Sequence, residues 1–420
     1  MGENNKKRPY TKKTVRKTPS RKTSVHNETV KNVLKVGAVA AAAVKTAKKG
    51  KKSGGGSFVA VFVCLILILA IGAGLYYFFV LKKDTPDKNI AFSDADISVH
   101  FIELGNKYTG DCTLIKVGDT EVLIDCGSRV SSVGTVSDYL NNYIKDNILE
   151  YVIITHAHED HYAGFATPEN VNSIFDLYEC KTIITFSNTN QVVKGMYANY
   201  LRELNDEIAR GATHYTADKC YNEEDGAKRT YDLGKGYELE ILYNKFYWET
   251  TEGENNFSVC CMVQGDGKHF LFTGDLEKKG EEALAERYKT DHASLSASFK
   301  VDLYKAGHHG SKTSSNVKFL EVFKPKICCV CCCAGSSEYT KVSENQFPTQ
   351  DFIDRISVYT DKVYVTTLCI DYANNKFESF NGNIVVFANS EGIGVKCSAN
   401  DIKLKDTAWF NENRTSNNWK

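Results

Sequence analysis

A short run of histidine and acidic residues carries the strongest chemical signal in this chain of 420 residues. Three histidines and two carboxylates lie within the six residues from His156 to His161, directly after an apolar run at 151–154. Imidazole and carboxylate suit borderline divalent metals, zinc above all. Residues two apart in an extended segment point the same way, so His156 and His158 are expected to bind one ion. Asp160 and His161 follow where the chain can turn toward a second ion. The competing interpretation is a solvated polar loop after a strand.

Three further motifs also place polar residues directly after apolar, strand-like runs. Asp125 ends LeuIleAsp at 123–125, Asp275 ends the run at 269–275, and His308 and His309 follow the run that begins at Tyr304. Loops at the strand ends of a rigid scaffold often converge on one binding site. One aspartate and one or two histidines are what the histidine loop needs to complete two metal sites.

Together these motifs resemble the metallo-β-lactamase superfamily, and specifically the hydrolase domain of the ComEC competence DNA-uptake family. Five motifs stand in the family's order across about residues 97–400: LeuIleAspCysGly at 123–127, HxHxDH at 156–161, AsnAsnPheSerVal at 255–259, ThrGlyAsp at 273–275 and GlyHisHisGlySer at 307–311. The resemblance implies an α/β fold, the αββα four-layer sandwich, which we expect behind a single N-terminal transmembrane helix. It covers the hydrolase domain of that family and not its many-helix channel.

Carried over residue by residue, the resemblance implies a site for two divalent metal ions, with zinc as first choice and manganese or iron as alternatives. The implied ligands are His156 and His158 on the first ion, Asp160 and His161 on the second, Asp275 bridging both, and His308, ahead of His309, completing the second. Asp160 and His309 are also predicted to take part in catalysis, Asp160 by orienting the attacking hydroxide. Asp125 is predicted to fix a ligand histidine from behind the metal shell.

Two departures from the family pattern concern the first ion. Many relatives carry a further histidine between the HxHxDH loop and the bridging aspartate, and His214 is a weak candidate for it here. Relatives also often carry GlyHisPro in the C-terminal third, where this chain has GlnPhePro at 346–348. The third ligand of the first ion is therefore open, and His309 is one residue that could supply it.

The predicted function is a membrane-anchored, extracytoplasmic, metal-dependent hydrolase of the phosphodiesterase or nuclease type. Two ions a few ångströms apart lower the pKa of a water molecule between them and hold the attacking and leaving oxygens. Nucleic acid or a cell-envelope phosphodiester is the expected substrate. The alternatives are a β-lactam or other ester or amide hydrolase of the same fold, and a non-catalytic binding protein that retains the fold. The sequence does not indicate an oligomeric state.

The formal net charge of zero hides two oppositely charged parts. Residues 1–52 contain 16 basic and 2 acidic side chains, a balance of +14, so residues 53–420 hold 52−16 = 36 basic and 52−2 = 50 acidic ones, a balance of −14. An acidic domain should repel polyanions unless it has a local basic groove.

Between the two parts lie 24 uncharged residues, 58–81, which are long enough to span a bilayer. We interpret them as an uncleaved signal-anchor rather than a cleaved signal peptide, whose basic and apolar regions are shorter. The positive-inside rule then places the N-terminus in the cytoplasm and the catalytic domain outside the membrane. The predicted organisation is a basic disordered cytoplasmic arm (1–57), the transmembrane signal-anchor (58–81), a stalk (82–96), the hydrolase domain (97–405) and a polar tail (406–420).

Five of the fourteen cysteines lie in one apolar run, 327–334. Such a run predicts a strand buried on both faces, in which cysteine acts as a small hydrophobic residue. A thiolate metal site or disulfides are the alternative, but five ligands on alternating sides of a strand could not converge.

Apolar spacing predicts five helices and twelve strands, arranged as two packed sheets with helices outside. The helices are expected at 131–146, 192–210, 276–288, 315–323 and 349–357. The strands are expected at 99–104, 113–117, 121–124, 151–155, 238–243, 257–264, 268–273, 300–306, 326–333, 362–367, 382–388 and 392–397.

Overall fold

The computed structural model of the chain describes residues 90–293 and 298–419. The predicted arm at 1–57, the predicted transmembrane segment at 58–81 and the first part of the predicted stalk lie outside these residues. Within the described part of the chain, none of the helices combines the length and the apolar character that a membrane crossing needs.

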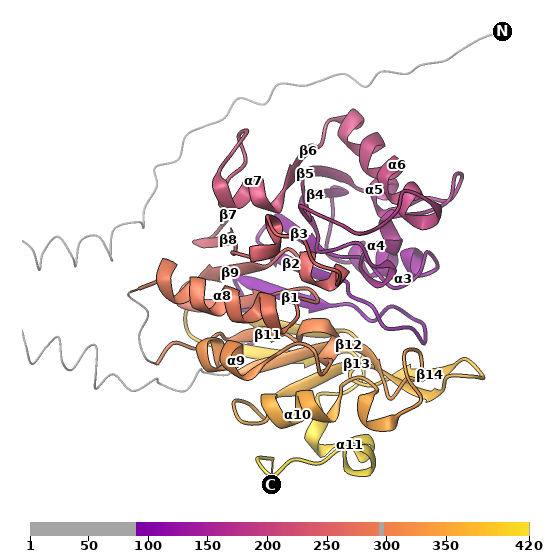
Figure 1. Cartoon of the computed structure of the whole chain (residues 1–420), viewed down its shortest axis with the longest axis vertical. Helices are drawn as coiled ribbons and strands as arrows, with labels where there is room; N and C mark the ends of the chain where they lie inside the picture. Colours follow the sequence, from indigo (N-terminus) through magenta and orange to yellow (C-terminus); the bar gives the residue numbers. More distant parts are fainter. Residues whose placement is uncertain (1–89, 294–297, 420) are drawn as a thin grey trace, which may run out of the picture. The chain divides into compact units, whose positions relative to one another are not determined.

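The described residues form two eight-stranded sheets (Figure 1). The first sheet runs in the order β16 (Ile393–Cys397), β15 (Ile384–Ala388), β1 (Ile97–Phe101), β2 (Thr113–Val117), β3 (Thr120–Ile124), β4 (Ile148–Ile154), β5 (Glu179–Thr185) and β6 (Thr213–Thr216). From β3 to β6 the strands are parallel, and the other pairs are antiparallel. The antiparallel β2–β3 hairpin turns at Gly118, whose φ of 62° suits glycine.

The second sheet runs in the order β14 (Lys376–Ser379), β13 (Val363–Asp371), β12 (Ile327–Ala334), β11 (Leu303–Lys305), β10 (Lys268–Phe272), β9 (Cys261–Gly265), β8 (Tyr237–Ile241) and β7 (Thr230–Gly234). Its central strands, from β10 to β13, are parallel. Both sheets therefore have a parallel core, and the carboxyl ends of neighbouring parallel strands lie at one edge of each sheet.

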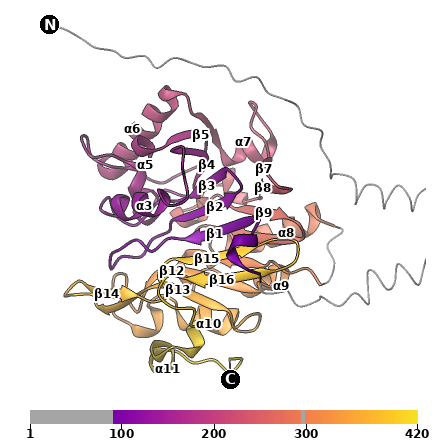
Figure 2. The ribbon, with the colours of Figure 1, turned by 180° about the vertical axis from the view of Figure 1, so that it is seen from behind.

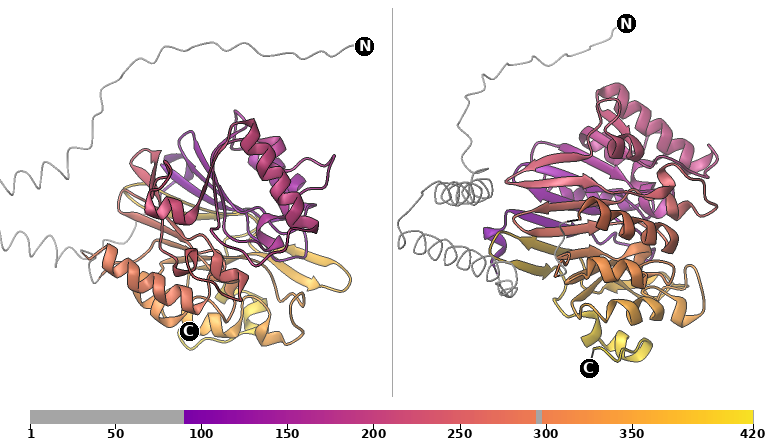
Figure 3. Two further views of the ribbon diagram at one scale, coloured as in Figure 1. Left: turned by 45° about the horizontal axis from the view of Figure 1, so that its top comes forward. Right: turned by 60° about the vertical axis from the view of Figure 1, so that its left-hand side comes forward.

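Helices cover the outer faces of the two sheets. Figure 3 shows the strands running between the magenta helix α6 on one side and the orange helices on the other. The helices of seven or more residues are α3 (Ser132–Leu140), α6 (Gly195–Arg210), α8 (Lys278–Asp291), α9 (Val317–Phe323) and α10 (Gln350–Ile356). The shorter helices are α4 (Glu159–Tyr162), α5 (Ile174–Leu177), α7 (Ala217–Asn222) and α11 (Ala408–Asn413). The predicted α/β sandwich of two sheets with helices outside is confirmed.

Strand β12 shows how the core is divided. Cys329 and Cys331 belong to the larger apolar cluster, which the first sheet dominates, whereas Cys328, Val330 and Cys332 belong to a second cluster with residues of α8, α9 and α10. All eight residues of the strand are buried, and no cysteine in the described part of the chain is paired in a disulfide. The prediction of a strand buried on both faces is therefore confirmed.

Both ends of the described chain pack against the domain. The ring of Phe92, in the predicted stalk, lies 5.3 Å from the ring of Phe387 in β15. The predicted polar tail at 406–420 includes α11, and its Phe410, Arg414 and Trp419 are buried. Phe410 and Trp419 belong to the second core cluster, so this segment packs against the domain although most of its residues are polar.

Candidate metal centre

Asp125 lies directly after β3 and contacts both the start and the end of the histidine motif, at Thr155 and His161. Strands β3 and β4 are parallel neighbours, so Asp125 meets Thr155, the first residue after β4. The backbone N–H of Thr155 donates to Asp125 Oδ1 at 2.7 Å, and Nδ1 of His161 lies 2.8 Å from Oδ2. An imidazole whose Nδ1–H donates to a carboxylate presents Nε2 as its ligand atom. Asp125 thus holds His161 as the sequence predicted.

The turn after β3 depends on a glycine. A Cβ on Gly127 would lie 1.7 Å from the backbone oxygen of Asp160, so no other residue fits there without moving the histidine loop. The N–H of Cys126 donates to the carbonyl of His161 at 2.7 Å, which fastens the two loops together.

His156 and His158 project toward one another, as expected for residues two apart in an extended segment. Nε2 of His156 lies 3.0 Å from Nδ1 of His158. Zn–N bonds of about 2.0–2.1 Å would place two ligand nitrogens about 3.3 Å apart in a tetrahedral site, so this spacing suits a shared ion. Burial, together with the neighbouring His161, holds the pKa of His156 well below its usual value, which keeps the ring neutral.

Asp275 joins the two sheets at the centre of the cluster. It follows β10 through Gly274, which has φ of 51° and leaves no room for a Cβ beside Ser258 and Thr155. Its Oδ2 lies 3.3 Å from Nε2 of His161 and 3.3 Å from Nε2 of His309. Asp275 therefore lies between ligands from both halves of the sandwich, which is where a bridging carboxylate is required.

The geometry favours His309 over His308 as the histidine that completes the cluster. Nδ1 of His309 lies 2.9 Å from the carbonyl oxygen of Cys331, so it carries the proton, and Nε2 faces Asp275 and Asp160, each at 3.3 Å. His309 is fully buried. His308 is partly exposed, its Nε2 is 3.8 Å from Asp275, and its Nδ1 lies 2.9 Å from Thr313 Oγ1. The preference for His308 drawn from chain position is therefore not supported by these distances.

Sequence reasoning missed two buried charged residues, Asp111 and Lys305. The Lys305 ammonium contacts Asp111 Oδ2 and lies 3.7 Å from Asp275 Oδ1. Asp111 Oδ1 lies 3.1 Å from Nδ1 of His309. Asp111 precedes β2, and in an antiparallel hairpin the start of β2 lies beside the end of β3. The predicted hairpin could therefore have pointed to Asp111, although Asp111 precedes its strand and the predicted site residues follow theirs.

Four ligand atoms, one each from Asp111, His161, Asp275 and His309, lie within 4.8 Å of one another. All four residues are buried. Burial alone would lower the pKa of His161 and His309, but Asp275 and the other carboxylates outweigh it and raise both well above the usual value. The carboxylates thus favour positive charge in this cluster, and a bound metal cation would supply that charge in place of the two ring protons.

The donor atoms fit a divalent metal. Nε2 of His161, Nε2 of His309 and Oδ1 of Asp275 are buried without a hydrogen-bond partner among the residues that the structure describes. Unsatisfied buried polar atoms are costly, and aligned imidazole and carboxylate donors suit zinc, manganese or iron. The pair of His156 and His158 lies beside this group, with the His156 and His161 rings 4.1 Å apart. These residues could hold one or two ions.

Phe347, in the GlnPhePro segment at 346–348, lies beside the two histidines of the 307–311 motif. Its ring centroid lies 5.7 Å from that of His308 and 5.9 Å from that of His309, so the segment reaches the cluster but brings no ligand atom. His214, the other candidate for an additional ligand, lies in β6 with Nε2 2.9 Å from Thr185 Oγ1, and it does not join the cluster.

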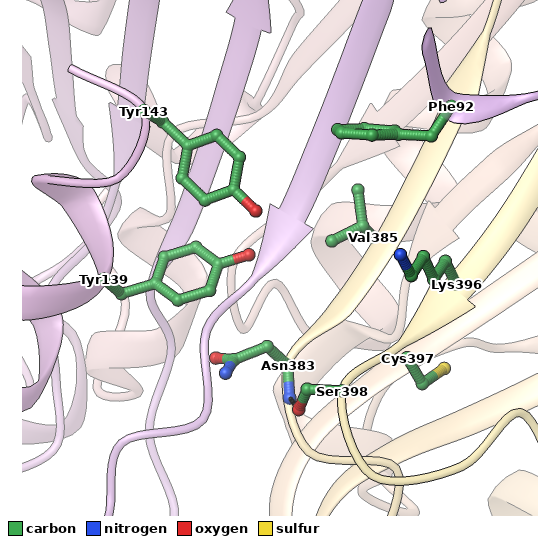
Figure 4. A pocket seen from close by; sticks show the side chains of 8 residues that line it. All are labelled: Phe92, Tyr139, Tyr143, Asn383, Val385, Lys396, Cys397 and Ser398. Carbon is green, nitrogen blue, oxygen red and sulfur yellow. Dashed lines mark hydrogen bonds between the residues drawn. The ribbon is translucent and has the colours of Figure 1, made fainter. Parts of the chain in front are cut away.

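An open cavity of about 600 Å³ lies over the cluster, lined by Arg129, His158, Glu159, Asp160, Asp275, His308, Glu338, Tyr339 and Tyr372. The Tyr339 hydroxyl donates to Asp160 Oδ2 at 3.1 Å. A second cavity, of about 140 Å³, is lined by Tyr139, Tyr143 and Lys396, among others, without a histidine or carboxylate (Figure 4). The cavity at the histidine cluster is therefore the one suited to metal chemistry.

Comparison with known proteins finds similarity to the same superfamily. Residues 105–167 match the sequence model of the metallo-beta-lactamase superfamily. ComE operon protein 3 of Bacillus subtilis is 32% identical over 100 residues, which is 23% of this chain and 12% of that protein. Recombination protein 2 of Haemophilus influenzae is 25% identical over 272 residues, 64% of this chain and 28% of that protein. The chain thus matches less than a third of the length of either curated relative.

Among solved structures, the metallo-beta-lactamase fold protein YhfI from Bacillus subtilis is 12% identical, with a TM-score of 0.30 over 50% of this chain and 71% of that one. The Neisseria gonorrhoeae competence protein ComA is a further sequence relative, 30% identical over 115 residues, which is 27% of this chain and 15% of that protein. The chain is thus similar over residues 105–167 to the metallo-beta-lactamase superfamily, and over longer stretches to competence proteins. This similarity agrees with the resemblance that its five ordered motifs carry.

Proposed function

We propose that this chain is a metal-dependent phosphodiesterase, whose reaction takes place in the cavity above Asp275. The observation that carries the proposal is the convergence of Asp111, His161, Asp275 and His309, all buried, with unpartnered ligand atoms at the foot of an open cavity. The similarity to competence proteins supports a phosphodiester rather than a β-lactam as substrate.

Each residue of the centre has a part in the proposed reaction. A divalent metal would supply Lewis-acid activation of water and of the scissile phosphoryl group. His156, His158, His161, Asp275 and His309 would hold the metal, and Asp125 fixes the ring of His161. Asp160, which accepts from Tyr339 and faces His309, is placed to orient the attacking water by accepting its hydrogen bond. Lys305 keeps Asp111 charged next to His309.

The test is metal content together with turnover of bis(p-nitrophenyl) phosphate by the full-length protein. We expect one to two divalent ions per chain and measurable turnover. The double variant Asp160→Ala/His161→Ala should lose metal and fall to background, because it removes a ligand and the residue that orients water. His214→Ala is the matched control, since that histidine lies in β6 outside the cluster, and it should keep both.

Three outcomes are informative. Metal and turnover that are lost together in the double variant support the proposal. Metal binding without turnover of the diester, but with hydrolysis of an ester or a lactam, would replace phosphodiesters by another substrate class. A wild-type protein that binds no divalent metal would contradict the proposal and favour a binding protein that retains the fold.

We also propose that residues 58–81 anchor the enzyme in the membrane with its catalytic domain outside the cytoplasm. The support is in the sequence alone: 24 uncharged residues follow an arm with a charge balance of +14. Release of the full-length protein from membranes by alkaline carbonate would contradict the anchor.

A further inference from the structure

The cavity above the centre has one basic residue in its wall. Among the described residues that line this cavity, Arg129 is the only arginine or lysine, and Glu338, Tyr339 and Tyr372 line the cavity with it. About one third of its side chain is exposed, 32%, so the guanidinium faces the cavity rather than the core.

Contacts from separate loops hold Arg129 in place. Its Nη2 donates to Glu338 Oε1 at 3.1 Å, and its Nη1 donates to the carbonyl of Ser128 at 2.7 Å. The guanidinium carbon lies 4.1 Å from the ring centroid of Tyr108. Glu338 is itself held, because it accepts from the N–H of Thr109 at 2.9 Å. A guanidinium fixed in this way gives up little side-chain entropy when it binds a ligand.

The Arg129 guanidinium has N–H groups that are not used by its contacts with Ser128 and Glu338. Its remaining N–H groups have no partner in residues 90–293 and 298–419, because the bonds to Ser128 and Glu338 and the stacking on Tyr108 are its contacts there. A planar fork with free N–H groups binds carboxylate or phosphate oxygens, often two at a time. The arginine is therefore free to bind an anion while Glu338 holds it.

Next to Arg129 and Tyr372, outside the cavity lining itself, lie another aromatic ring and a second cation. Tyr108 and Tyr372 pack edge to face with centroids 6.3 Å apart, and the Lys107 ammonium lies 4.2 Å from the ring centroid of Tyr372. Figures 1 and 2 show that the loop after β1 and the β13–β14 hairpin, which carry these tyrosines, extend on the same side of the molecule. Lys107, Tyr108, Arg129 and Tyr372 thus form a basic and aromatic surface at the side of the cavity, although residues 53–420 have a charge balance of −14.

We infer that Arg129 binds a second anionic group of the substrate, one that lies beside the scissile phosphodiester and takes no part in bond breaking. The substrate class is a phosphodiester that carries another phosphate on the neighbouring unit. This inference rests on the proposed phosphodiesterase function and makes Arg129 a specificity-determining residue of that site.

The test compares two chromogenic diesters that differ in one phosphate. Thymidine 5′-(p-nitrophenyl phosphate) has the scissile group alone, and its 3′-phosphorylated counterpart carries the second anion. In the full-length protein, Arg129→Gln should raise KM for the 3′-phosphorylated diester about ten-fold, because charge-assisted hydrogen bonds are lost. The rise in KM should be much smaller for the simpler diester, which has no second anion for Arg129 to bind. Arg129→Lys should recover part of the loss, since it keeps the charge but not the fork.

Arg202→Gln is the matched control. Arg202 has a similar exposure, 29%, and a similar bond to a carboxylate, that of Glu203 at 2.6 Å, but it lies in α6 and does not line the cavity. Its replacement should leave both KM values unchanged. If Arg129→Gln changes the two KM values equally, or neither, the inference is wrong and Arg129 only braces Glu338 and Tyr108.

The inference and the proposed function can fail separately. If the wild type hydrolyses neither diester, the phosphodiesterase proposal fails, and equilibrium binding of thymidine 3′,5′-bisphosphate then tests Arg129 alone. Weaker binding to Arg129→Gln than to the wild type and Arg202→Gln would support an anion site. Equal binding to all three proteins would overturn it.

Discussion

At the scale of single residues, the ring nitrogen that carries the proton determines which nitrogen of each histidine can bind a metal. His161 and His309 each direct Nδ1 to an acceptor, Asp125 Oδ2 and the Cys331 carbonyl, and each leaves Nε2 for the shared centre. A carboxylate or carbonyl behind a metal-binding imidazole fixes both the tautomer and the ring orientation. His308 has no such buried support, since its Nδ1 lies against the Thr313 hydroxyl.

This difference predicts unequal losses when either histidine is replaced. His309→Gln should weaken metal binding by about 10- to 100-fold or abolish it, whereas His308→Gln should weaken it by less than about ten-fold. Metal bound per chain after dialysis against graded chelator, measured by elemental analysis, gives the comparison. The reverse order of losses would restore His308 as the ligand.

At the scale of elements, α8 and α10 hold the loop that follows His309. Glu281 of α8 accepts from the N–H groups of Ser315 and Asn316 at 2.6 and 2.8 Å and from the Asn316 side chain at 2.6 Å. Arg355 of α10 donates to the carbonyls of Ser314 and Ser315. The loop at 311–316 is thus fixed from both sides, which explains how a segment without regular structure can position its neighbouring histidines.

Glu281 makes stability depend on pH in a defined direction. Burial raises its pKa to about 7 from an ordinary value of 4.5, although hydrogen bonds from Asn316 and Ser315 oppose the rise. Between these values the folded protein binds a proton that the unfolded chain does not, so the free energy of unfolding falls as pH rises through that window. The loss should reach about 3 kcal/mol by pH 7 and above, and Glu281→Gln should remove it.

Urea unfolding of the wild type and Glu281→Gln from about pH 4.5 to about pH 8 measures this dependence. Glu282→Gln is the control, because Glu282, the next residue of α8, forms only a surface ion pair with Lys318 at 3.4 Å. The account of Glu281 is wrong if the stability difference between wild type and Glu281→Gln stays constant across the range.

At the scale of the whole molecule, most of the cysteines lie in the buried core of the two sheets. Of the thirteen cysteines in the described chain, only Cys369 and Cys397 are partly exposed, and the eleven others are buried. Burial raises the pKa of the Cys397 thiol to about 12, with Asp401 adding to the rise. Thiolate is the reactive form, so exposure and pKa together limit reactivity.

The folded protein should therefore react slowly and incompletely with Ellman's reagent. Of the thirteen thiols in the described chain, we expect the two partly exposed ones to react, and the other eleven to react only after unfolding in denaturant. Counting the thiolate released before and after denaturation is the measurement. Rapid reaction of many thiols in the native protein would mean that the cysteine strand β12 is not in a packed core.

The site motifs could be located from sequence because each depends on local order. Asp125, the histidine loop, Asp275 and the pair at 308–309 all follow apolar runs, and parallel strands must end at one edge of a sheet. The same patterning predicted the long strands and helices, including β12 and α6. It missed β5, β6, β7 and β14, because these strands carry few apolar residues. Polar residues occupy much of β5, whose apolar side chains are Cys180, Ile183 and Ile184, and β6, Thr213–Thr216, has only Tyr215; both strands exist through pairing with neighbours.

The chain order of residues therefore indicated the fold class and most of the candidate ligand residues, while the contacts between distant segments settled how these residues are arranged. Local sequence does not encode which of two adjacent histidines turns inward, because that choice depends on the Cys331 carbonyl, 22 residues further along the chain. Nor does it place Arg129 beside Glu338, 209 residues away. Hydrophobic periodicity reports which face of an element is buried, but the polar contacts of a site form only once both sheets have packed.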